Sequence, residues 1–309
     1  MYMAEQIHLP NPALRGRLLA DEPMRKHLSW RTGGSADRAY VPADLEDAAQ
    51  FLRGLRETEP VYFIGLGSNL LVRDGGIRGT VMLMHCSRAA VRMDGELLYA
   101  EAGAASPKVA RYAATRGYAG AEFLAGIPGT VGGALAMNAG CYGSQTWDRV
   151  ERVLMLGRGG ELRRREPGDF DIGYRHVALR QGGLGSLEWF AAAWFGFERG
   201  EGAAALARIR KLLQQRIKEQ PLALPNAGSV FRNPPGDHAA RLIEACGLKG
   251  HAIGGARVSE KHANFIVNPV GAGSAADIEG LIEFVRQTVL AKCGVDLLPE
   301  VRIIGEHAR

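Results

Sequence analysis

The stretch from Phe123 to Gly143 has a composition suited to binding phosphate. It contains six glycines in 21 residues, and no charged side chain occurs between Glu122 and Asp148. Glycine lets a ligand approach the backbone closely, and backbone N–H groups can then donate to phosphate oxygens. A membrane span would not carry Pro128, Asn138 and six helix-weakening glycines, and a mobile linker would not carry so many apolar side chains. We therefore expect buried irregular backbone around a large bound cofactor.

A second glycine loop, Gly65–Leu66–Gly67–Ser68–Asn69, lies between two short apolar runs that predict strands. The dinucleotide-binding fingerprint requires a third glycine and a following helix, whereas here Leu70 begins a β-like run. No Walker A sequence occurs in the chain. The loop could hold a pyrophosphate with its backbone N–H groups and two polar side chains, or it could be a simple β-turn.

Arg175, Ser229 and Glu300 are polar residues at positions that a structural role alone explains poorly. Arg175 lies in a predicted loop, Ser229 lies at a predicted turn, and Glu300 stands between a proline and an apolar run. Taken singly, each is more readily explained as a solvated side chain. Ser229 lacks the Gly-x-Ser-x-Gly pattern of a hydrolase nucleophile. His251 and His262 could act as bases, although a single histidine is more often structural.

The composition is that of a globular protein with an unusual share of glycine. Of 309 residues, 41 are glycine, and the formal net charge is +5. The length predicts two or three domains. The densest basic cluster, at 163–165, is too small for a nucleic-acid interface, so we expect no nucleic-acid partner. A modest positive charge suits an anionic small molecule.

The four cysteines have neither zinc-binding nor disulfide-framework spacing; they are Cys86, Cys141, Cys246 and Cys293. We therefore expect reduced thiols, no metal site and a cytoplasmic location. No apolar segment near the N-terminus predicts a secretory signal, and we expect no membrane span.

Strands and helices alternate irregularly over the first 200 residues, which predicts an α+β fold rather than a doubly wound sheet. We expect strands ending near Val41 and at 61–64, 70–72, 80–84, 97–100, 152–156 and 186–197. Asp44 and Ser106 are expected N-caps of helices, and Gly117 is expected to end the second helix.

A long amphipathic helix over 203–219 changes the pattern, and we place a domain boundary near residue 200. Beyond it we expect a helix at 239–246 and a strand at 264–267. Ser274 and Asp277 predict the start of a further helix. A final strand at about 298–305 is expected to carry Glu300 back to the site.

Seven segments, in this order, resemble the UDP-N-acetylenolpyruvoylglucosamine reductase (MurB) family, flavoenzymes of peptidoglycan precursor synthesis. Each segment is weakly specific alone, and their combination between about residues 29 and 304 is highly specific. The segments are GLGSNLLV (65–72), GIPGTVGGA (126–134), NAGCYG (138–143), GYR (173–175), NAGS with FRNP (226–234), SEKHANFI (259–266) and LPEV (298–301).

The resemblance implies a PCMH-type FAD-binding region over 1–200, made of two α+β subdomains that divide near residue 86. It implies an α+β substrate-binding domain over 201–309. Both glycine loops are assigned to FAD by this resemblance. The implied FAD-binding residues are Gly65, Leu66, Gly67, Ser68, Asn69, Leu70, Gly126, Ile127, Pro128, Gly129, Thr130, Gly132, Gly133, Ala134, Asn138, Gly140, Tyr142 and Gly143.

The resemblance also implies the reaction, the reduction of UDP-N-acetylglucosamine enolpyruvate to UDP-N-acetylmuramate. NADPH would pass a hydride to FAD, and C3 of the enolpyruvyl group would receive it from the flavin N5. Arg175 matches the residue that stabilises the resulting negative charge, and Ser229 matches the proton donor to C2. Glu300 matches a second stabilising residue. A carboxylate there would repel the charge, so we expect the pKa of Glu300 to be raised.

The chain resembles the shorter, type II form of the family, because the connection after Arg175 leaves no room for a longer insertion with a substrate-covering tyrosine. The implied substrate contacts are Tyr174, Lys218, Arg232, Asn233 and Lys261. We expect a monomer whose partners are NADPH and the enolpyruvyl substrate.

Two other functions stay open. Another PCMH-type flavoenzyme, such as an oxidase of alcohols or sugars, would share the FAD loops but would react with oxygen. A non-catalytic nucleotide-binding or sensor protein would not need Arg175, Ser229 and Glu300 to meet.

Overall fold

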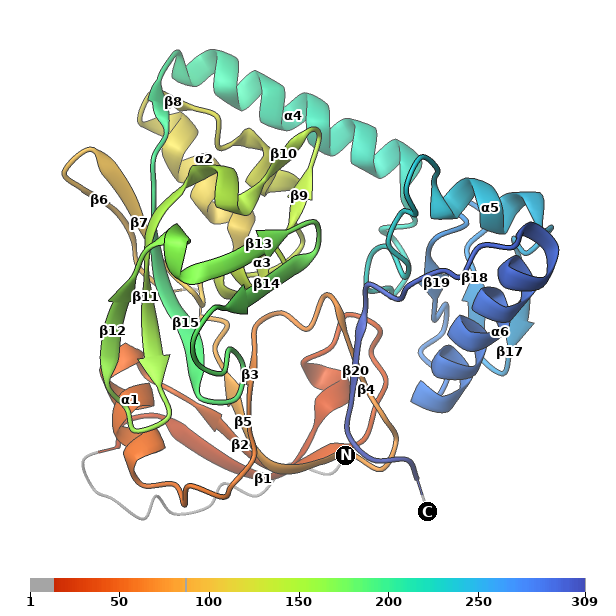
Figure 1. Ribbon diagram of the computed structural model, residues 1–309, viewed down its shortest axis with the longest axis horizontal. Helices are drawn as coiled ribbons and strands as arrows, with labels where there is room; N and C mark the ends of the chain where they lie inside the picture. The colour runs from red at the N-terminus through yellow and green to blue at the C-terminus, as the bar shows by residue number, and fades with distance from the viewer. Residues whose placement is uncertain (1–13, 87, 309) are drawn as a thin grey trace. The chain divides into compact units, whose positions relative to one another are not determined.

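The computed structural model describes residues 14–86 and 88–308. Figure 1 shows helices and strands mixed along the chain, which confirms the expected α+β class. Most of the N-terminal segment that was considered for a secretory signal lies outside the described residues. Within the described part, no helix is both long and apolar enough to cross a membrane.

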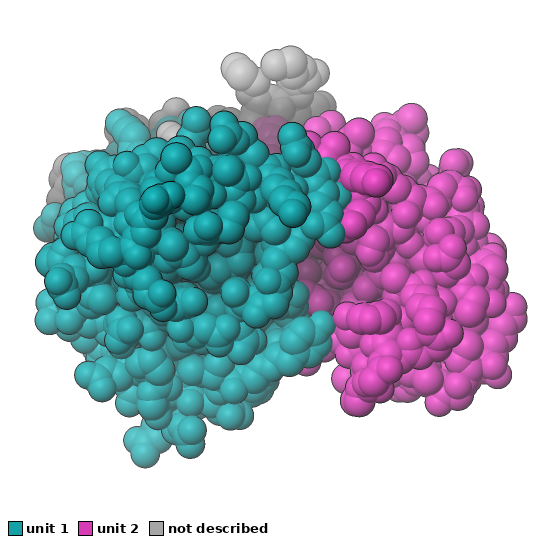
Figure 2. All heavy atoms as spheres, turned by 90° about the horizontal axis from the view of Figure 1, so that it is seen from above, with its two compact units in different colours: residues 1–20, 38–66, 79–215 teal, residues 21–37, 67–78, 216–309 magenta. Residues whose placement is uncertain are grey.

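The chain divides into two compact units (Figure 2). Unit 1 comprises the chain up to Ala20, residues 38–66 and residues 79–215; unit 2 comprises residues 21–37, 67–78 and 216–309. This division differs from a single cut near residue 200, because two N-terminal segments pack into the core of unit 2. Trp30 and Leu71 are fully buried there, and the Trp30 indole Nε1–H donates to the Ile266 carbonyl at 2.8 Å.

Unit 1 contains a five-stranded antiparallel sheet in the order β12-β11-β15-β7-β6. Its strands are β6 (Val91–Asp94), β7 (Leu97–Glu101), β11 (Val150–Gly157), β12 (Leu162–Arg165) and β15 (Glu188–Phe195). Every residue of β15 is buried, as expected for a central strand covered on both faces. Helices α2 (Ser106–Thr115) and α3 (Val131–Ala136) share its hydrophobic core.

A four-stranded sheet has the order β1-β2-β5-β3, and the division between the units falls within three of its strands. The strands are β1 (Arg17–Pro23), β2 (Ser35–Val41), β3 (Val61–Ile64) and β5 (Ile77–Leu83). Helix α1 (Leu45–Arg53) begins after Asp44, whose side chain accepts from the Asp47 N–H, so this predicted N-cap is confirmed.

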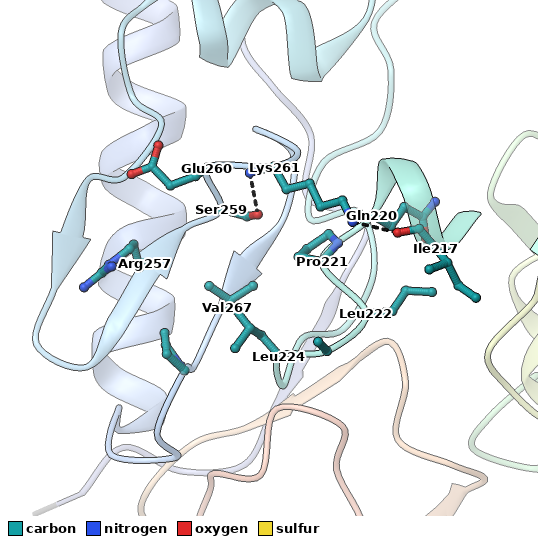
Figure 3. Close-up of a pocket in the computed structure, with 12 residues that line it drawn as sticks. Ile217, Gln220, Pro221, Leu222, Leu224, Arg257, Ser259, Glu260, Lys261 and Val267 are labelled. Atoms are coloured by element: carbon teal, nitrogen blue, oxygen red, sulfur yellow. Dashed lines mark hydrogen bonds between the residues drawn. The ribbon is translucent and has the colours of Figure 1, made fainter. Parts of the chain in front are cut away.

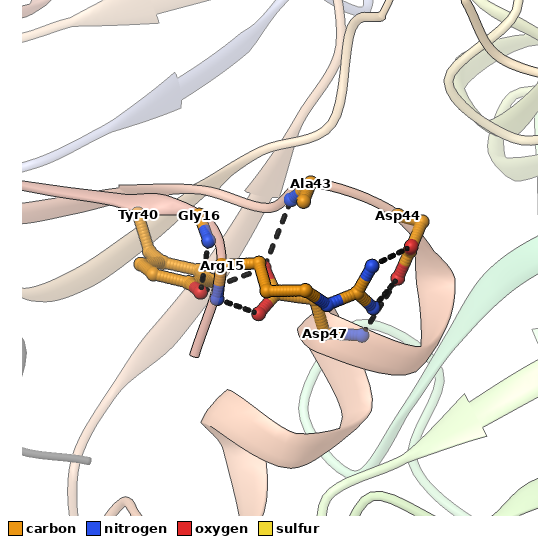
Figure 4. Close-up of polar contacts among 6 residues, drawn as sticks. All are labelled: Arg15, Gly16, Tyr40, Ala43, Asp44 and Asp47. Atoms are coloured by element: carbon orange, nitrogen blue, oxygen red, sulfur yellow. Dashed lines mark hydrogen bonds and ion pairs between the residues drawn. The ribbon is translucent and has the colours of Figure 1, made fainter. Parts of the chain in front are cut away.

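The start of α1 is fixed by the buried Asp47 carboxylate (Figure 4). It accepts hydrogen bonds from the Arg15 N–H, the Ala43 N–H and the Tyr40 hydroxyl, at 2.7, 2.8 and 2.7 Å. Burial, together with the neighbouring Asp47, raises the pKa of Tyr40. The phenol therefore stays protonated and can donate to Asp47 over the whole physiological range.

Unit 2 is built on the small sheet β17-β18-β19 and two helices. The bounds are β17 (Ala252–Ile253), β18 (Ala256–Val258), β19 (Ile266–Val267), α5 (Ala239–Ala245) and α6 (Ala275–Cys293). The predicted capping box between Ser274 and Asp277 begins α6 and is confirmed. Strand β20 (Arg302–Ile304) pairs in parallel with β4 (Leu70–Val72).

The remaining elements are short, apart from α4 (Gly202–Glu219), which is the predicted long helix. Three further two-stranded pairs are present among the described residues. They are β8 (Tyr118–Ala119) with β16 (Glu198–Arg199), β9 (Gly140–Cys141) with β10 (Ser144–Gln145), and β13 (Phe170–Gly173) with β14 (His176–Leu179). The 3₁₀ turns are η1 (Met24–Lys26), η2 (Glu122–Gly126), η3 (Thr146–Arg149) and η4 (Pro167–Asp169).

Two local predictions are wrong. Helix α2 begins one residue earlier than expected, with Ala105 as N-cap, so Ser106 is its first residue and does not cap it. The last strand is limited to Arg302–Ile304, and Glu300 precedes it. Proline at 299 interrupts regular pairing ahead of the strand, since it has no N–H to donate.

Candidate active site

The start of the first glycine loop lies against the second glycine loop in unit 1. A Cβ atom at Gly65 would lie 2.3 Å from the Thr130 Oγ1, and one at Gly126 would lie 2.6 Å from the Cys141 Sγ. Internal packing therefore requires glycine at both positions, independently of any ligand. Gly133 differs, because it is exposed and the Thr130 Oγ1 is 3.8 Å from its ideal Cβ position. A ligand can approach the backbone closely at Gly133.

The backbone at the start of α3 is partly used within the protein. The N–H groups of Val131 and Gly132 donate to the carbonyls of Ala104 and Ala102 at 2.8 and 2.9 Å. These two groups cannot donate to a phosphate without breaking those bonds. The donors for a cofactor must therefore come from other parts of the loop or from its neighbours.

The Ser106 hydroxyl is a buried donor beside the second loop. Ser106 is fully buried, and its Oγ has no hydrogen-bond partner among the described residues. Its N–H donates to the Gly129 carbonyl at 2.9 Å, which places it beside the second glycine loop. A buried hydroxyl without a partner is costly. Because this oxygen has no accessible surface, a cofactor cannot contact it directly, and the exposed backbone at Gly133 is where the second loop fits the close approach of FAD.

The second half of the first loop belongs to unit 2. The Gly67 carbonyl accepts from the Ser29 N–H and hydroxyl, both at 3.2 Å. Asn69 Nδ2 donates to the Glu300 carbonyl at 3.1 Å. The loop is therefore connected to the backbone of one predicted catalytic residue.

Arg175 lies at the tip of a hairpin in unit 1. Gly173 pairs with His176 across β13 and β14, which leaves Tyr174 and Arg175 as the turn. Arg175 has a φ of +54°, a left-handed conformation that is uncommon outside glycine. Its guanidinium donates to the carbonyls of Asn138 and Gly140 at 3.2 and 3.0 Å. The strained turn and the two carbonyls together fix the position of the cation.

Asn138 connects the second glycine loop to this hairpin. It is fully buried, and its Nδ2 donates to the Gly173 carbonyl at 3.1 Å and to the Gln145 Oε1 at 3.0 Å. Its Oδ1 accepts from the Trp147 N–H at 3.1 Å. The Asn138 amide is therefore engaged within the protein, and its visible role is to hold the hairpin that carries Arg175.

Ser229 and Glu300 are brought together in unit 2. The Glu300 N–H donates to the Val230 carbonyl at 2.7 Å, and Phe231 forms an antiparallel bridge with Pro299. Gly228, with a φ of +76°, turns the chain immediately before Ser229. The two predicted catalytic residues thus lie on adjacent backbone segments although they are far apart in sequence.

Asn264 holds this pair of segments and was not predicted as a functional residue. Its Oδ1 accepts from the Phe231 N–H at 2.9 Å, and its Nδ2 donates to the Phe231 carbonyl at 2.8 Å. Its own carbonyl accepts from the Val230 N–H at 2.9 Å. Val230 and Phe231, the two residues after Ser229, are therefore both hydrogen-bonded to Asn264. The only signal in the sequence was the position of Asn264 within the SEKHANFI segment.

The two histidines that could act as bases have structural partners. His251 stacks on Phe284 with ring centroids 4.3 Å apart. His262 packs edge-on against Phe265, and its Nδ1 accepts from the Asn264 N–H at 3.3 Å. Burial lowers the pKa of His262. A neutral imidazole is the form that can accept at Nδ1, so the hydrogen bond and the lowered pKa agree.

A pocket of about 430 Å³ lies within unit 2 (Figure 3). Its walls are mainly apolar and come from the end of α4, the following loop and the small sheet. The polar residues among its lining are Gln220, Arg257, Ser259, Glu260 and Lys261. Lys261 donates from Nζ to the Ile217 carbonyl at 2.6 Å and from its backbone N–H to the Ser259 Oγ at 3.1 Å.

The other predicted substrate contacts do not line this pocket. Tyr174 is exposed beside Arg175 in unit 1, and Lys218 is exposed on α4. Arg232 donates its N–H to the Leu298 carbonyl, and its buried Nε has no partner among the described residues. The Asn233 Oδ1 accepts from the Ala239 N–H at the start of α5.

Family models match both parts of the chain. An FAD binding domain matches residues 36–165, and the C-terminal domain of UDP-N-acetylenolpyruvoylglucosamine reductase matches residues 220–304. A UDP-N-acetylenolpyruvoylglucosamine reductase from Thiobacillus denitrificans is 58% identical, over 96% of this chain and 94% of that relative. The chain belongs to the UDP-N-acetylenolpyruvoylglucosamine reductase family. The family assignment makes it an oxidoreductase with an FAD-binding domain.

Further relatives agree with this assignment. A reductase of the same name from Nitrosospira multiformis is 57% identical, over 96% of this chain and 91% of that relative. The crystal structure of MurB from Thermus caldophilus matches with a TM-score of 0.78 and 28% identity, over 94% of this chain and 99% of that one. The expected family and the expected α+β architecture with an FAD-binding region are therefore confirmed.

Proposed function

We propose that this chain catalyses the NADPH-dependent reduction of UDP-N-acetylglucosamine enolpyruvate to UDP-N-acetylmuramate in peptidoglycan precursor synthesis. The observation that supports this most directly is the hydrogen bond of 2.7 Å from the Glu300 N–H to the Val230 carbonyl. It brings Glu300 beside Ser229, the two residues that the family resemblance assigns to charge stabilisation and proton donation. We further propose that the enzyme works as a monomer in the cytoplasm.

Bound FAD would supply the redox chemistry, accepting a hydride from NADPH and providing one for C3 of the enolpyruvyl group. Gly133 is the residue of unit 1 best placed to hold it, because it is exposed and leaves the backbone open to close approach. NADPH needs no dedicated Rossmann motif if it binds transiently as a substrate.

Arg175 would stabilise the negative charge that develops at C2 and the adjoining carboxylate. Its guanidinium is held by two backbone carbonyls, so little reorganisation is needed when the charge appears. Ser229 would donate a proton to C2. Because a serine hydroxyl is a weak acid, it must act on a strongly basic carbon and be protonated again afterwards.

The pocket in unit 2 is the proposed site for the uridine diphosphate part of the substrate. Its volume of about 430 Å³ lies in the range of small-molecule sites, and its apolar walls suit a base and a ribose. Lys261 and Arg257 supply positive charge at its edge for a diphosphate. Lys261→Ala should therefore raise KM for the substrate about tenfold, with a smaller change in kcat.

The test of the proposal separates the two half-reactions. Ser229→Ala should leave FAD bound and reducible by NADPH, and should block reoxidation by the enolpyruvyl substrate. Arg175→Ala should cost about 3–4 kcal/mol in that second step, as for the loss of an oxyanion donor. Unchanged turnover in Ser229→Ala would remove Ser229 from the mechanism. Fast reoxidation of the reduced wild type by oxygen alone would instead favour an oxidase.

A further inference from the structure

Cys246 and Cys293 lie side by side in unit 2, although 47 positions separate them in the chain. Their Sγ atoms are 3.6 Å apart. Cys246 caps the C-terminus of α5 and is buried, whereas Cys293 is the last residue of α6 and is exposed. The other two cysteines, Cys86 and Cys141, belong to unit 1.

The packing of the two helices fixes this arrangement. Apolar residues of α5 and α6 share one hydrophobic core, including Leu242, Ile243, Val285 and Val289. Both helices end at the cysteines and are followed by glycines in the left-handed conformation, with φ of +73° at 247 and +68° at 294. The Lys292 Nζ also donates to the Cys246 carbonyl at 3.1 Å. The ends of α5 and α6 are therefore held together without a covalent bond.

The sulfur atoms need a small movement to bond. A disulfide has an S–S length of about 2.05 Å, so the present separation must close by about 1.5 Å. Cys293 is exposed at a helix end, where its side chain can rotate. The burial of Cys246 and its contact with Cys293 raise the pKa of Cys246. An external oxidant should therefore react first at the accessible Cys293 thiol.

We propose that Cys246 and Cys293 are a redox modification site, at which a low-molecular-weight disulfide of the glutathione type forms an intrachain disulfide between α5 and α6. The Cys293 thiolate attacks the small disulfide, which forms a mixed disulfide and releases one thiol. The Cys246 thiolate then attacks the Cys293 sulfur and releases the second thiol. Two protein thiols are oxidised, one disulfide is reduced to two thiols, and the protons of the protein thiols pass to these products.

The bond would close a loop that contains four polar residues of the pocket: Arg257, Ser259, Glu260 and Lys261. Closing this loop limits the freedom of the unfolded chain, so the oxidised form should be more stable than the reduced form. This covalent state of unit 2 depends on the surrounding ratio of thiols to disulfides and not on the proposed reaction.

The experiment treats the FAD-loaded full-length protein with oxidised glutathione and follows free thiols and intact mass. The count of reactive thiols in denaturant should fall from four to two, with the loss of two hydrogen masses and no retained glutathione. Peptide mapping should recover a Cys246–Cys293 cross-link. The melting temperature should rise by several degrees and return after reduction.

Single serine variants supply the controls. Cys246→Ser should retain one glutathione on Cys293, because no second thiol is present to resolve the mixed disulfide. Cys293→Ser should react much more slowly at the buried Cys246. A double Cys86→Ser/Cys141→Ser variant should form the cross-link as the wild type does. A stable glutathione adduct on wild-type Cys293, a cross-link to another cysteine, or four unreacted thiols would each overturn the proposal.

Discussion

Two buried asparagines perform the same task in different ways in the two units. In unit 1, the Asn138 side chain holds the hairpin of Arg175 by one hydrogen bond to the Gly173 carbonyl. The backbone carbonyl of Asn138 accepts a hydrogen bond from the Arg175 guanidinium. In unit 2, Asn264 holds the segment after Ser229 by a donor and acceptor pair with Phe231. Asn138 therefore supports the Arg175 side chain directly, whereas Asn264 supports the backbone segment after Ser229.

The difference follows from the backbone that each asparagine must hold. Asn138 lies in the glycine-rich loop and itself has a φ of +41°, a conformation that asparagine tolerates better than most residues. Asn264 acts as a substitute for a neighbouring strand, since its amide presents a donor and an acceptor to the same residue. Neither a carboxylate nor an apolar side chain offers both groups. An uncharged amide is therefore required in each unit, for different reasons.

The largest effect is expected for Asn138→Leu. The change keeps a similar volume but leaves the buried Trp147 N–H and the Gly173 carbonyl without their partner, and leucine is strained at a φ of +41°. Losing these bonds should cost about 3–5 kcal/mol and most of the turnover. Urea unfolding followed by aromatic fluorescence measures the loss. Asn138→Asp keeps the acceptor for Trp147 but turns a buried carboxylate oxygen toward the Gly173 carbonyl, so it should also be destabilised. Equal stability of Asn138→Leu and the wild type would contradict this role.

The second prediction concerns Asn264→Ala, which removes both bonds to Phe231. It should destabilise the protein by about 2–4 kcal/mol and lower kcat at least tenfold. Asn268 is the matched control, because it is fully buried in the same unit and bonds to Trp30 and Gly273. Asn268→Ala should be destabilised similarly and should keep the wild-type kcat. A similar fall in kcat in both variants would show that Asn264 contributes only to the general stability of the protein.

A smaller effect is expected for Gly228→Ala. The φ of +76° at this position is strained for alanine, so the variant should lose about 1–2 kcal/mol and misplace Ser229. Gly271 has a φ of +66° in an exposed loop of the same unit. Gly271→Ala should lose similar stability without affecting kcat, which steady-state assays of both variants can measure.

The smallest effect is a pH dependence of stability that involves His262. Burial lowers its pKa in the folded state below the usual 6.5, so near pH 8 the residue is neutral in both states and contributes nothing. Below about pH 6.5 the unfolded chain binds the proton first, so stability falls as the pH is lowered. Urea unfolding at pH 8 and pH 5.5 should show a smaller fall in His262→Gln than in the wild type. An equal fall in both proteins would contradict the assignment.

Sequence patterns predicted local structure well where it depends on neighbouring residues, as at the N-cap Asp44 and the capping box of Ser274 and Asp277. The segment around Arg175 was expected to be a loop, whereas β13 and β14 pair on either side of its turn. The division into units was not predicted, because it depends on Trp30 and Leu71 packing with residues more than 200 positions away.

The roles of Asn138 and Asn264 also could not be predicted from the sequence. Asn138 was assigned to FAD by resemblance, and its amide bonds within the protein appear only in three dimensions. Asn264 lies in a segment that resembles the family, but its role depends on Phe231, 33 positions away. Ser106 was expected to cap α2, and a shift of one residue converts it into a buried hydroxyl beside the second glycine loop.

The most direct test of the account is a single-turnover experiment on enzyme whose FAD has first been reduced by NADPH. The reduced wild type, Asn264→Ala and Asn268→Ala are mixed separately with saturating enolpyruvyl substrate, and the return of the flavin absorbance is recorded. We predict normal reduction in all three, with slow return in Asn264→Ala alone. Equal rates of return in all three proteins would contradict the claim that the backbone held by Asn264 positions the proton donor.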